Sequence, residues 1–123
     1  MSRILIADDE SLVNRMLESR LIRENFLVDF VTDAQLTLSL IRNNKYDVIL
    51  LDPLFARISG WKVITEIRNN VRNASTPIIV FSSLSSDKLI SDVLASGVKD
   101  YIVKPFGLDV VVAKVIQFSR NAK

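Results

Sequence analysis

Hydrophobic residues follow two alternating patterns along the chain. Five short runs are almost wholly apolar, and each has the length of a β-strand. They cover residues 4–7, 27–31, 48–51, 78–81 and 101–103. Runs without alternating polar residues are typical of strands in a parallel sheet that is buried on both faces.

The segments between these runs have the spacing of amphipathic helices, with apolar residues recurring at intervals of three and four positions. Ser11 stands near the expected start of the first helix, and Ser86 or Asp87 is expected to cap the fourth. Gly97 is expected to end the fourth helix. The residues that mark the five helices are Val13, Met16, Leu17 and Leu21; Leu36, Leu40 and Ile41; Val63, Ile64, Ile67 and Val71; Leu89, Ile90, Val93 and Leu94; and Leu108, Val111, Val112, Val115 and Phe118.

Five strand–helix units in regular alternation predict an α/β fold with a parallel sheet covered by helices. The chain has 123 residues, of which 49% are hydrophobic, and this suits a single globular core. No internal repeat, low-complexity tract or linker interrupts the alternation. We therefore expect one domain that spans residues 1–123.

Several classes of function are excluded by the composition. The chain has no cysteine and no histidine, so disulfides, thiolate nucleophiles, imidazole bases and histidine-bound zinc are ruled out. Its formal net charge of +2 is too small to mark a nucleic-acid-binding face. No apolar run approaches the length of about 20 residues that a membrane span needs, and no secretory leader is evident, so we expect a cytoplasmic protein.

Chemically useful side chains follow the strands at their carboxyl ends. Asp8 and Asp9 come after the first run, Asp52 after the third, Ser82 ends the fourth, and Lys104 follows the fifth. In open parallel sheets, functional groups gather at this edge. Clustered carboxylates suit Mg²⁺, and a lysine can bind an anion as a point charge. The set predicts a phosphoryl-transfer site with an aspartate as the nucleophile.

Four segments together resemble the receiver domain of two-component response regulators, a family of the CheY-like superfamily. They are "ILIADDE" at residues 4–10, "YDVILLD" at 46–52, "PIIVFSS" at 77–83 and "GVKDYIVKPF" at 97–106, and Gly60 also matches the family pattern. Each motif is weak alone, but four in order at matching separations are specific. The resemblance implies a flavodoxin-like sheet of strand order 2-1-3-4-5 with five helices.

The same resemblance implies a role for each acidic site residue. Asp52 would accept a phosphoryl group from a phosphohistidine on a sensor histidine kinase or a phosphotransfer protein. Asp9 and Asp52 would bind Mg²⁺ directly, together with the backbone carbonyl of Leu54. Asp8 would act on the ion largely through water.

The resemblance also implies how the signal would leave the site. Lys104, held by a cis peptide bond to Pro105, would pair with the phosphoryl oxygens, and Ser82 would donate a hydrogen bond to one of them. Tyr101 would turn inward on activation. The domain would act as a switch rather than an enzyme, passing the signal to an effector protein or domain, or to a second copy. The contact surface would be the fourth helix, fifth strand and fifth helix, including Lys88, Asp92, Lys99, Asp100 and Lys114.

Each of these residues also fits an ordinary structural role. Asp9 and Glu10 could complement the positive end of the first helix, worth about 0.3–1 kcal/mol each. Ser82 could be a turn serine, and Tyr101 could pack in the core with its hydroxyl reaching solvent. Lys104 could be a solvated surface lysine.

The loop after Asp52 departs from the family pattern. Pro53, Phe55, Ala56 and Ser59 replace residues of other types. Pro53 has no N–H, so one potential donor to a phosphoryl group is missing. This keeps open a pseudo-receiver, a protein-binding module that signals without phosphorylation. A Mg²⁺-dependent phosphatase is a third reading, but the chain offers no segment to cover a small substrate.

Overall fold

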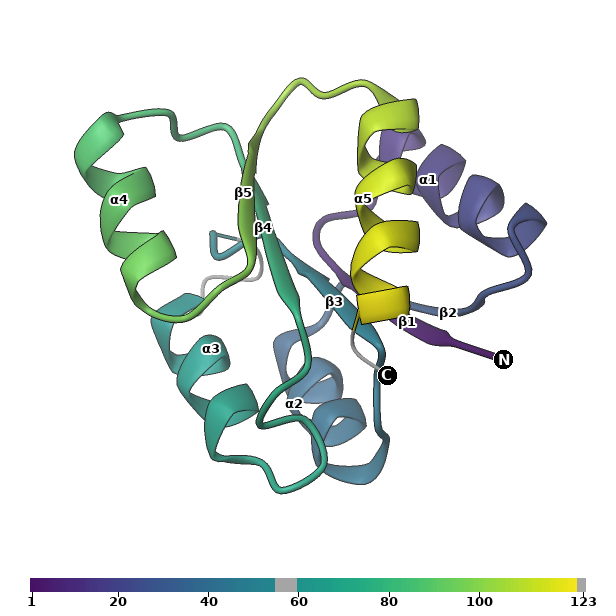
Figure 1. Ribbon diagram of the computed structural model, residues 1–123, viewed down its shortest axis with the longest axis horizontal. Helices are drawn as coiled ribbons and strands as arrows, with labels where there is room; N and C mark the ends of the chain where they lie inside the picture. Colours follow the sequence, from purple (N-terminus) through teal and green to yellow (C-terminus); the bar gives the residue numbers. More distant parts are fainter. Residues whose placement is uncertain (55–59, 122–123) are drawn as a thin grey trace.

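The computed structural model describes residues 1–54 and 60–121, in which strands and helices alternate along the chain (Figure 1). The departures noted at Phe55, Ala56 and Ser59 lie outside the described residues. The elements are β1 (Arg3–Ala7), α1 (Leu12–Arg23), β2 (Leu27–Val31), α2 (Ala34–Asn43), β3 (Val48–Leu51), α3 (Gly60–Asn69), β4 (Ile78–Ser82), α4 (Asp87–Ala95), β5 (Asp100–Val103) and α5 (Leu108–Asn121).

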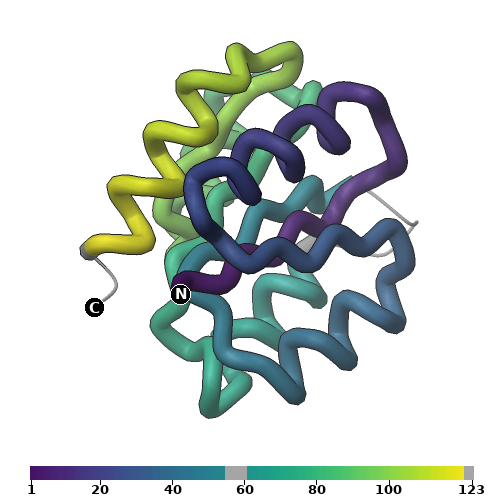
Figure 2. The backbone as a smooth tube through the Cα atoms, turned by 90° about the vertical axis from the view of Figure 1, so that its right-hand side faces the viewer, coloured from purple at the N-terminus to yellow at the C-terminus, as the bar shows by residue number. Residues whose placement is uncertain are grey.

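The five strands form one parallel sheet in the order β2-β1-β3-β4-β5. The predicted flavodoxin-like fold is therefore confirmed. Two helices, α1 and α5, cover one face of the sheet, and α2, α3 and α4 cover the other, as Figures 1 and 2 show from two directions. The result is a three-layer sandwich.

The core is divided by the sheet into two clusters of buried side chains. One lies under α2, α3 and α4 and includes Ile41, Ile67 and Val93. The other lies under α1 and α5 and includes Leu17 and Val115. The central strands β1, β3 and β4 contribute to both clusters, because alternate residues of a strand point to opposite faces.

Burial on both faces holds for the central strands but not for the edges. Every residue of β3 and β4 is buried, whereas Leu27, at the start of β2, is 51% exposed. Val103, at the end of β5, is 38% exposed. An edge strand has a neighbour on one side alone, so helices cover it less completely.

Three predicted helix boundaries are confirmed. Ser11 is the N-cap of α1, where its hydroxyl accepts a hydrogen bond of 3.0 Å from the Asn14 N–H. Ser86 caps α4 in the same way. Gly97 follows the last residues of α4 with φ +97°, a conformation that favours glycine over residues with a side chain.

Several residues taken as the buried face of a helix are instead exposed. In α1 the inward face carries Leu17 and Leu21, and not Val13 or Met16. The apolar spacing did not distinguish these positions, because it does not say which of two adjacent residues faces the sheet. Val71 lies beyond the end of α3. The exposed residues are Val13, Met16, Leu36, Val71 and Leu94.

The edge of the sheet opposite the carboxyl ends of the strands is closed by buried polar groups. Asn73 is fully buried, and its amide donates 2.8 Å hydrogen bonds to the carbonyl oxygens of Ile41 and Asn44. The buried Tyr46 donates from its hydroxyl to Asp29, which Arg3 also contacts. This network joins the end of α2 and the loop before β4 to the starts of β1 and β3.

Among the described helices, none combines the length and the apolar character that crossing a membrane requires.

Candidate functional site

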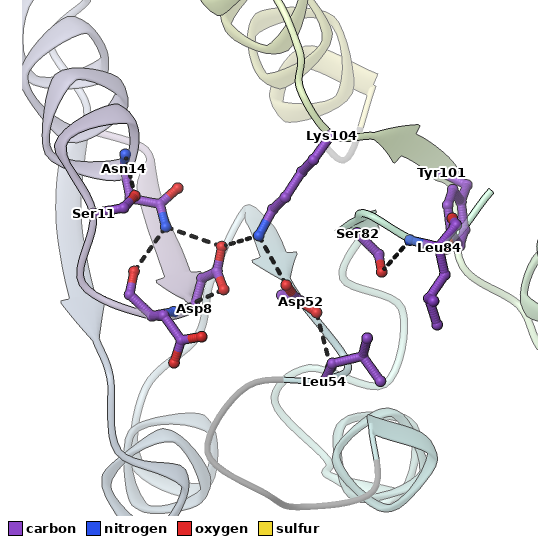
Figure 3. Close-up of polar contacts among 10 residues, drawn as sticks. Asp8, Ser11, Asn14, Asp52, Leu54, Ser82, Leu84, Tyr101 and Lys104 are labelled. Carbon is purple, nitrogen blue, oxygen red and sulfur yellow. Dashed lines mark hydrogen bonds and ion pairs between the residues drawn. The ribbon is translucent and has the colours of Figure 1, made fainter.

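Side chains from three strand ends converge at the carboxyl edge of the sheet (Figure 3). Strands β1 and β3 are neighbours, and Ala7 is in register with Leu51. The next residues, Asp8 and Asp52, therefore leave the sheet side by side. Lys104 follows β5, two strands away from β3, and its long side chain reaches back to both carboxylates.

Lys104 is the centre of this cluster. Its Nζ lies 2.6 Å from Asp8 Oδ2 and 2.8 Å from Asp52 Oδ2. It also lies 5.0 Å from the centroid of the Phe81 ring, within range of a cation–π interaction. Burial works against the charged ammonium, but the hydrogen bonds and charges of Asp52 and Asp8 outweigh it and raise the pKa of Lys104. Lys104 is thus a fixed cation shared by two carboxylates.

The two aspartates differ in their surroundings. The Asp8 side chain is 1% exposed. It accepts three hydrogen bonds, from the Asp9 N–H, from Asn14 Nδ2 and from Lys104 Nζ. The Asp52 side chain is 11% exposed and accepts from the Leu54 N–H and from Lys104. Asp52 is therefore the more accessible and the less fully bonded carboxylate.

The third member of the acidic run is directed elsewhere. Arg15 contacts both carboxylate oxygens of Glu10, at 2.6 and 2.8 Å, and also bonds Glu18. The Arg15 guanidinium holds the pKa of Glu10 below its usual range. Asp9 is exposed, and within residues 1–54 and 60–121 no three acidic side chains are grouped closely enough to hold a metal ion as they stand. The three consecutive acids therefore point in different directions.

Ser82 and Tyr101 both contact Leu84 rather than the acidic cluster. The Ser82 hydroxyl, which is fully buried, accepts a 3.2 Å hydrogen bond from the Leu84 N–H. The Tyr101 hydroxyl donates to the Leu84 carbonyl oxygen. Tyr101 also packs against the core cluster beneath α3 and α4. In this structure Ser82 forms a turn with Leu84 and Tyr101 is half buried. A role for either residue in switching stays a prediction.

The backbone around the cluster has two distinctive features. The Lys104–Pro105 peptide bond is cis. After Asp52, Pro53 offers no N–H, but the Leu54 N–H donates to Asp52 Oδ1 at 2.8 Å. The Leu54 N–H thus bonds the Asp52 carboxylate, whereas Pro53 contributes no donor.

A surface hollow of about 400 Å³ opens beside Lys104. It is bounded by the start of α1 on one side and by the segment between β5 and α5 on the other. Its lining residues are Ser11, Val13, Asn14, Ser83, Lys104, Pro105 and Phe106. The hollow gives a small molecule or a partner side chain room beside the ammonium.

Two residues that contact the acidic run, Asn14 and Arg15, were not identified from the sequence. Asn14 is 3% exposed and donates to Asp8, and Arg15 removes Glu10 from the cluster. Asparagine on the inward face of an otherwise apolar helix is a signal that could have identified Asn14, because a buried amide needs partners. No comparable signal marks Arg15, since exposed arginines on helices are common.

The sequence matches a known protein family. The sequence model of the response regulator receiver domain matches residues 4–116. The chain belongs to this family. The receiver domain is 38% identical over 117 residues to the response regulator ArlR of Staphylococcus saprophyticus, a match that covers 94% of this chain and 51% of ArlR. The chain thus spans about half the length of the curated relatives it matches.

Solved structures show the same architecture. The receiver domain of Francisella response regulator 1452 superimposes with a TM-score of 0.89, at 28% identity and with full coverage of both chains. The receiver domain of the Pseudomonas aeruginosa sensor histidine kinase PA1611 gives a TM-score of 0.84 at 23% identity, with 97% of this chain and 98% of that one covered. That structure is described with a magnesium ion coordinated in the active-site cleft.

Proposed function

We propose that this receiver domain accepts a phosphoryl group on Asp52 from a phosphohistidine of a sensor histidine kinase or a phosphotransfer protein. The observation that carries the proposal is the shared contact of Lys104 with Asp8 and Asp52. Of the two carboxylates, Asp52 is the more exposed and accepts fewer hydrogen bonds. It is therefore the better placed to act as a nucleophile.

In the proposed reaction, a carboxylate oxygen of Asp52 attacks the phosphorus atom. An O–P bond forms while the P–N bond to the imidazole breaks, and the imidazole nitrogen keeps the electron pair. Lys104, already 2.8 Å from Asp52, would pair with the transferred phosphoryl oxygens. The hollow beside Lys104 would admit the donor group.

The chemistry of the residues present fits a Mg²⁺ ion. The site offers carboxylate and carbonyl oxygens, the hard ligands that Mg²⁺ prefers, and its geometry already favours a cation between Asp8 and Asp52. Asp9 and Asp52 would hold the ion with the Leu54 carbonyl, and Asp8, whose oxygens are bonded to three donors, would act through water. When bound, the ion would neutralise charge on the transferring phosphoryl group. The PA1611 receiver domain, with its magnesium, has the same fold.

The output would be a change of surface rather than a chemical product, so the domain would serve as a switch and not as an enzyme. Asp100 pairs with Lys114 across β5 and α5, and Lys88 pairs with Asp92 within α4. A surface of mixed charge suits a protein partner, an effector domain or a second copy better than a nucleic acid. We place this single domain, residues 1–123, in the cytoplasm.

The proposal is tested by mass measurement. The purified chain is incubated with Mg²⁺ and acetyl phosphate, and the intact mass is compared before and after. One phosphate should be added to the wild type and none to Asp52→Asn. Asp47→Asn is the matched control, because Asp47 lies at the opposite end of β3 and bonds the Arg3 N–H. It should incorporate phosphate normally.

Two results would overturn this function. Phosphate that persists in Asp52→Asn would place the acceptor elsewhere. A wild-type chain that is folded, binds Mg²⁺ and stays unmodified would instead indicate a pseudo-receiver.

A further inference from the structure

Asn14 is a polar residue on a face of α1 that otherwise packs against the sheet. It is 3% exposed, and the other buried residues of this helix are Leu17 and Leu21. Asparagine is a poor helix former, and a buried amide without partners is costly. Its presence on this face therefore calls for specific hydrogen bonds.

Both hydrogens of the Asn14 amide are directed at the acidic run (Figure 3). Nδ2 donates to Asp8 Oδ2 at 2.9 Å and to the backbone oxygen of Asp9 at 2.8 Å. The cap of α1 is already supplied by Ser11, whose hydroxyl accepts from the Asn14 N–H. The amide side chain is thus not needed to satisfy the helix end, and it serves the loop that carries the acids.

Asp8 Oδ2 is shared between Asn14 and Lys104. The ammonium is 2.6 Å away and the amide 2.9 Å. The other oxygen, Oδ1, accepts from the Asp9 N–H at 2.7 Å. If Lys104 leaves Asp8, the carboxylate still has one donor on each oxygen, and Asn14 supplies the one on the oxygen that Lys104 vacates.

We infer that Asn14 is a positioning residue, which keeps the Asp8 carboxylate and the Asp9 backbone in place when Lys104 changes its partner from the carboxylates to a phosphoryl group. The inference rests on the proposed function, because only phosphoryl transfer at Asp52 draws Lys104 away. In the resting state Lys104 and Asn14 act on the same oxygen. Each partly compensates for loss of the other.

Shared control of one oxygen has a measurable consequence. Removing Asn14 should weaken Mg²⁺ binding, since groups that orient the surroundings of a metal site without touching the ion are worth about tenfold or more in affinity. The loss should be larger when Lys104 is also absent, because Asp8 then keeps only the Asp9 N–H. If the two substitutions acted independently, their effects on the free energy of Mg²⁺ binding would simply add.

The experiment is a double-mutant cycle with Asn14→Ala, Lys104→Ala and the double variant. Mg²⁺ is titrated without any phosphodonor, and the half-saturating concentration is followed by amide shifts around Asp52. We expect Asn14→Ala to raise that concentration by about tenfold in the Lys104→Ala background, and by less in the wild-type background. Asn14→Ser, whose side chain is shorter by one atom, should behave like Asn14→Ala.

Asn73→Ala is the matched control. Asn73 is also buried, and its amide also donates two hydrogen bonds, but both go to backbone carbonyl groups at the far edge of the sheet. It should lower the denaturation midpoint without changing the Mg²⁺ titration. Equal Mg²⁺ effects of Asn14→Ala and Asn73→Ala would reduce Asn14 to a general stabilising residue.

Equal losses from Asn14→Ala with and without Lys104 would also overturn the inference. Phosphate incorporation by the wild type, measured by mass on the same preparation, tests the proposed function separately. If the chain bound Mg²⁺ with the expected coupling but incorporated no phosphate, the positioning of Asp8 by Asn14 would be supported and the proposed reaction would be contradicted.

Discussion

The hydroxyl of Tyr101 donates a 2.7 Å hydrogen bond to the carbonyl oxygen of Leu84. The Leu84 N–H in turn donates to the hydroxyl of Ser82 at 3.2 Å. Two side chains from neighbouring strands, β4 and β5, are therefore attached to one residue of the loop before α4. A movement of Ser82 would release one side of Leu84 and disturb its contact with Tyr101.

Ser82→Ala should leave phosphorylation of Asp52 largely intact and reduce its effect on the surface of α4, β5 and α5. The reason is that a ligand shifts a conformational equilibrium only through contacts that differ between the two states, and the Ser82 hydroxyl would supply such a contact. Amide spectra with and without a beryllofluoride phosphate mimic measure the effect. The wild type should show large changes between Lys88 and Lys114.

Tyr101→Phe tests the Tyr101–Leu84 hydrogen bond separately from the Ser82–Leu84 hydrogen bond. It removes the bond to the Leu84 oxygen but leaves Ser82 intact, so changes near Asp52 should persist while those in α4 diminish. Spectra in which the wild type changes only near the metal-binding loops would contradict the proposed switch, even with Asp52 phosphorylated.

Lys104→Met should destabilise the resting protein by about 2 kcal/mol, because it leaves two adjacent buried carboxylates without their cation. We place the loss below the range for fully buried ion pairs, since the Lys104 side chain is 27% exposed. Urea unfolding measures the loss. Mg²⁺ should restore part of it, since a ligand that binds only the folded state stabilises that state.

Lys88→Met is the control for this prediction. Its side chain is 89% exposed and pairs only loosely with Asp92, at 3.5 Å, so its stability should change by less than about 0.5 kcal/mol. A Lys104→Met variant as stable as Lys88→Met, or one insensitive to Mg²⁺, would mean that the carboxylates do not depend on the ammonium.

The sequence was most informative where one physical rule dominates. The observed strands begin and end within one residue of the apolar runs. In the central strands this follows because burial on both faces excludes polar residues. The positions of Asp8, Asp52 and Lys104 also followed from the sequence, since parallel strands bring their carboxyl ends to one edge.

Side-chain contacts across the fold were harder to predict. The apolar pattern of α1 predicted that Val13 faces the sheet. The structure buries Asn14, because its amide bonds the acidic loop, and leaves Val13 46% exposed. Choices of this kind depend on partners distant in the fold, which a pattern along one helix does not contain.

Arg68→Met should loosen the turn that joins α4 to β5. The Arg68 guanidinium donates to the Gly97 carbonyl oxygen at 2.9 Å and to the Thr76 carbonyl oxygen at 2.9 Å, so it joins two loops through one side chain. Methionine keeps most of the aliphatic stem but no donor. Amide exchange at Val98 and Lys99 should become faster, whereas exchange in β1 should stay the same; uniform acceleration would indicate general destabilisation instead.

Tyr46 should make the stability of the fold depend on pH in alkaline solution. Tyr46 is fully buried, and its hydroxyl lies 2.7 Å from Asp29 Oδ2. Burial raises the pKa of Tyr46, and the hydrogen bond and negative charge of Asp29 raise it further. The folded state therefore keeps this proton above pH 10, where tyrosine in an unfolded chain begins to ionise.

Proton linkage gives the direction in which the free energy of unfolding changes with pH. Above about pH 10 the unfolded state binds fewer protons at Tyr46 than the folded state, so the stability that Tyr46 contributes is fully present below that pH and falls as pH rises. The steepest loss from one such group is about 1.4 kcal/mol per pH unit. The raised pKa of Lys104 adds a loss of the same sign above its ordinary value of 10.5.

Tyr46→Phe should cost about 1 kcal/mol at pH 7, through loss of the hydrogen bond to Asp29, but should reduce the alkaline decline. Its stability curve should therefore approach that of the wild type between pH 10 and about 11.5. Tyr101→Phe, which changes the only other tyrosine of the chain, is the matched control for the loss of a phenol hydroxyl. Urea midpoints from pH 7 upwards measure the three curves, and a Tyr46→Phe curve that stays parallel to the wild type would show that Tyr46 ionises equally in both states.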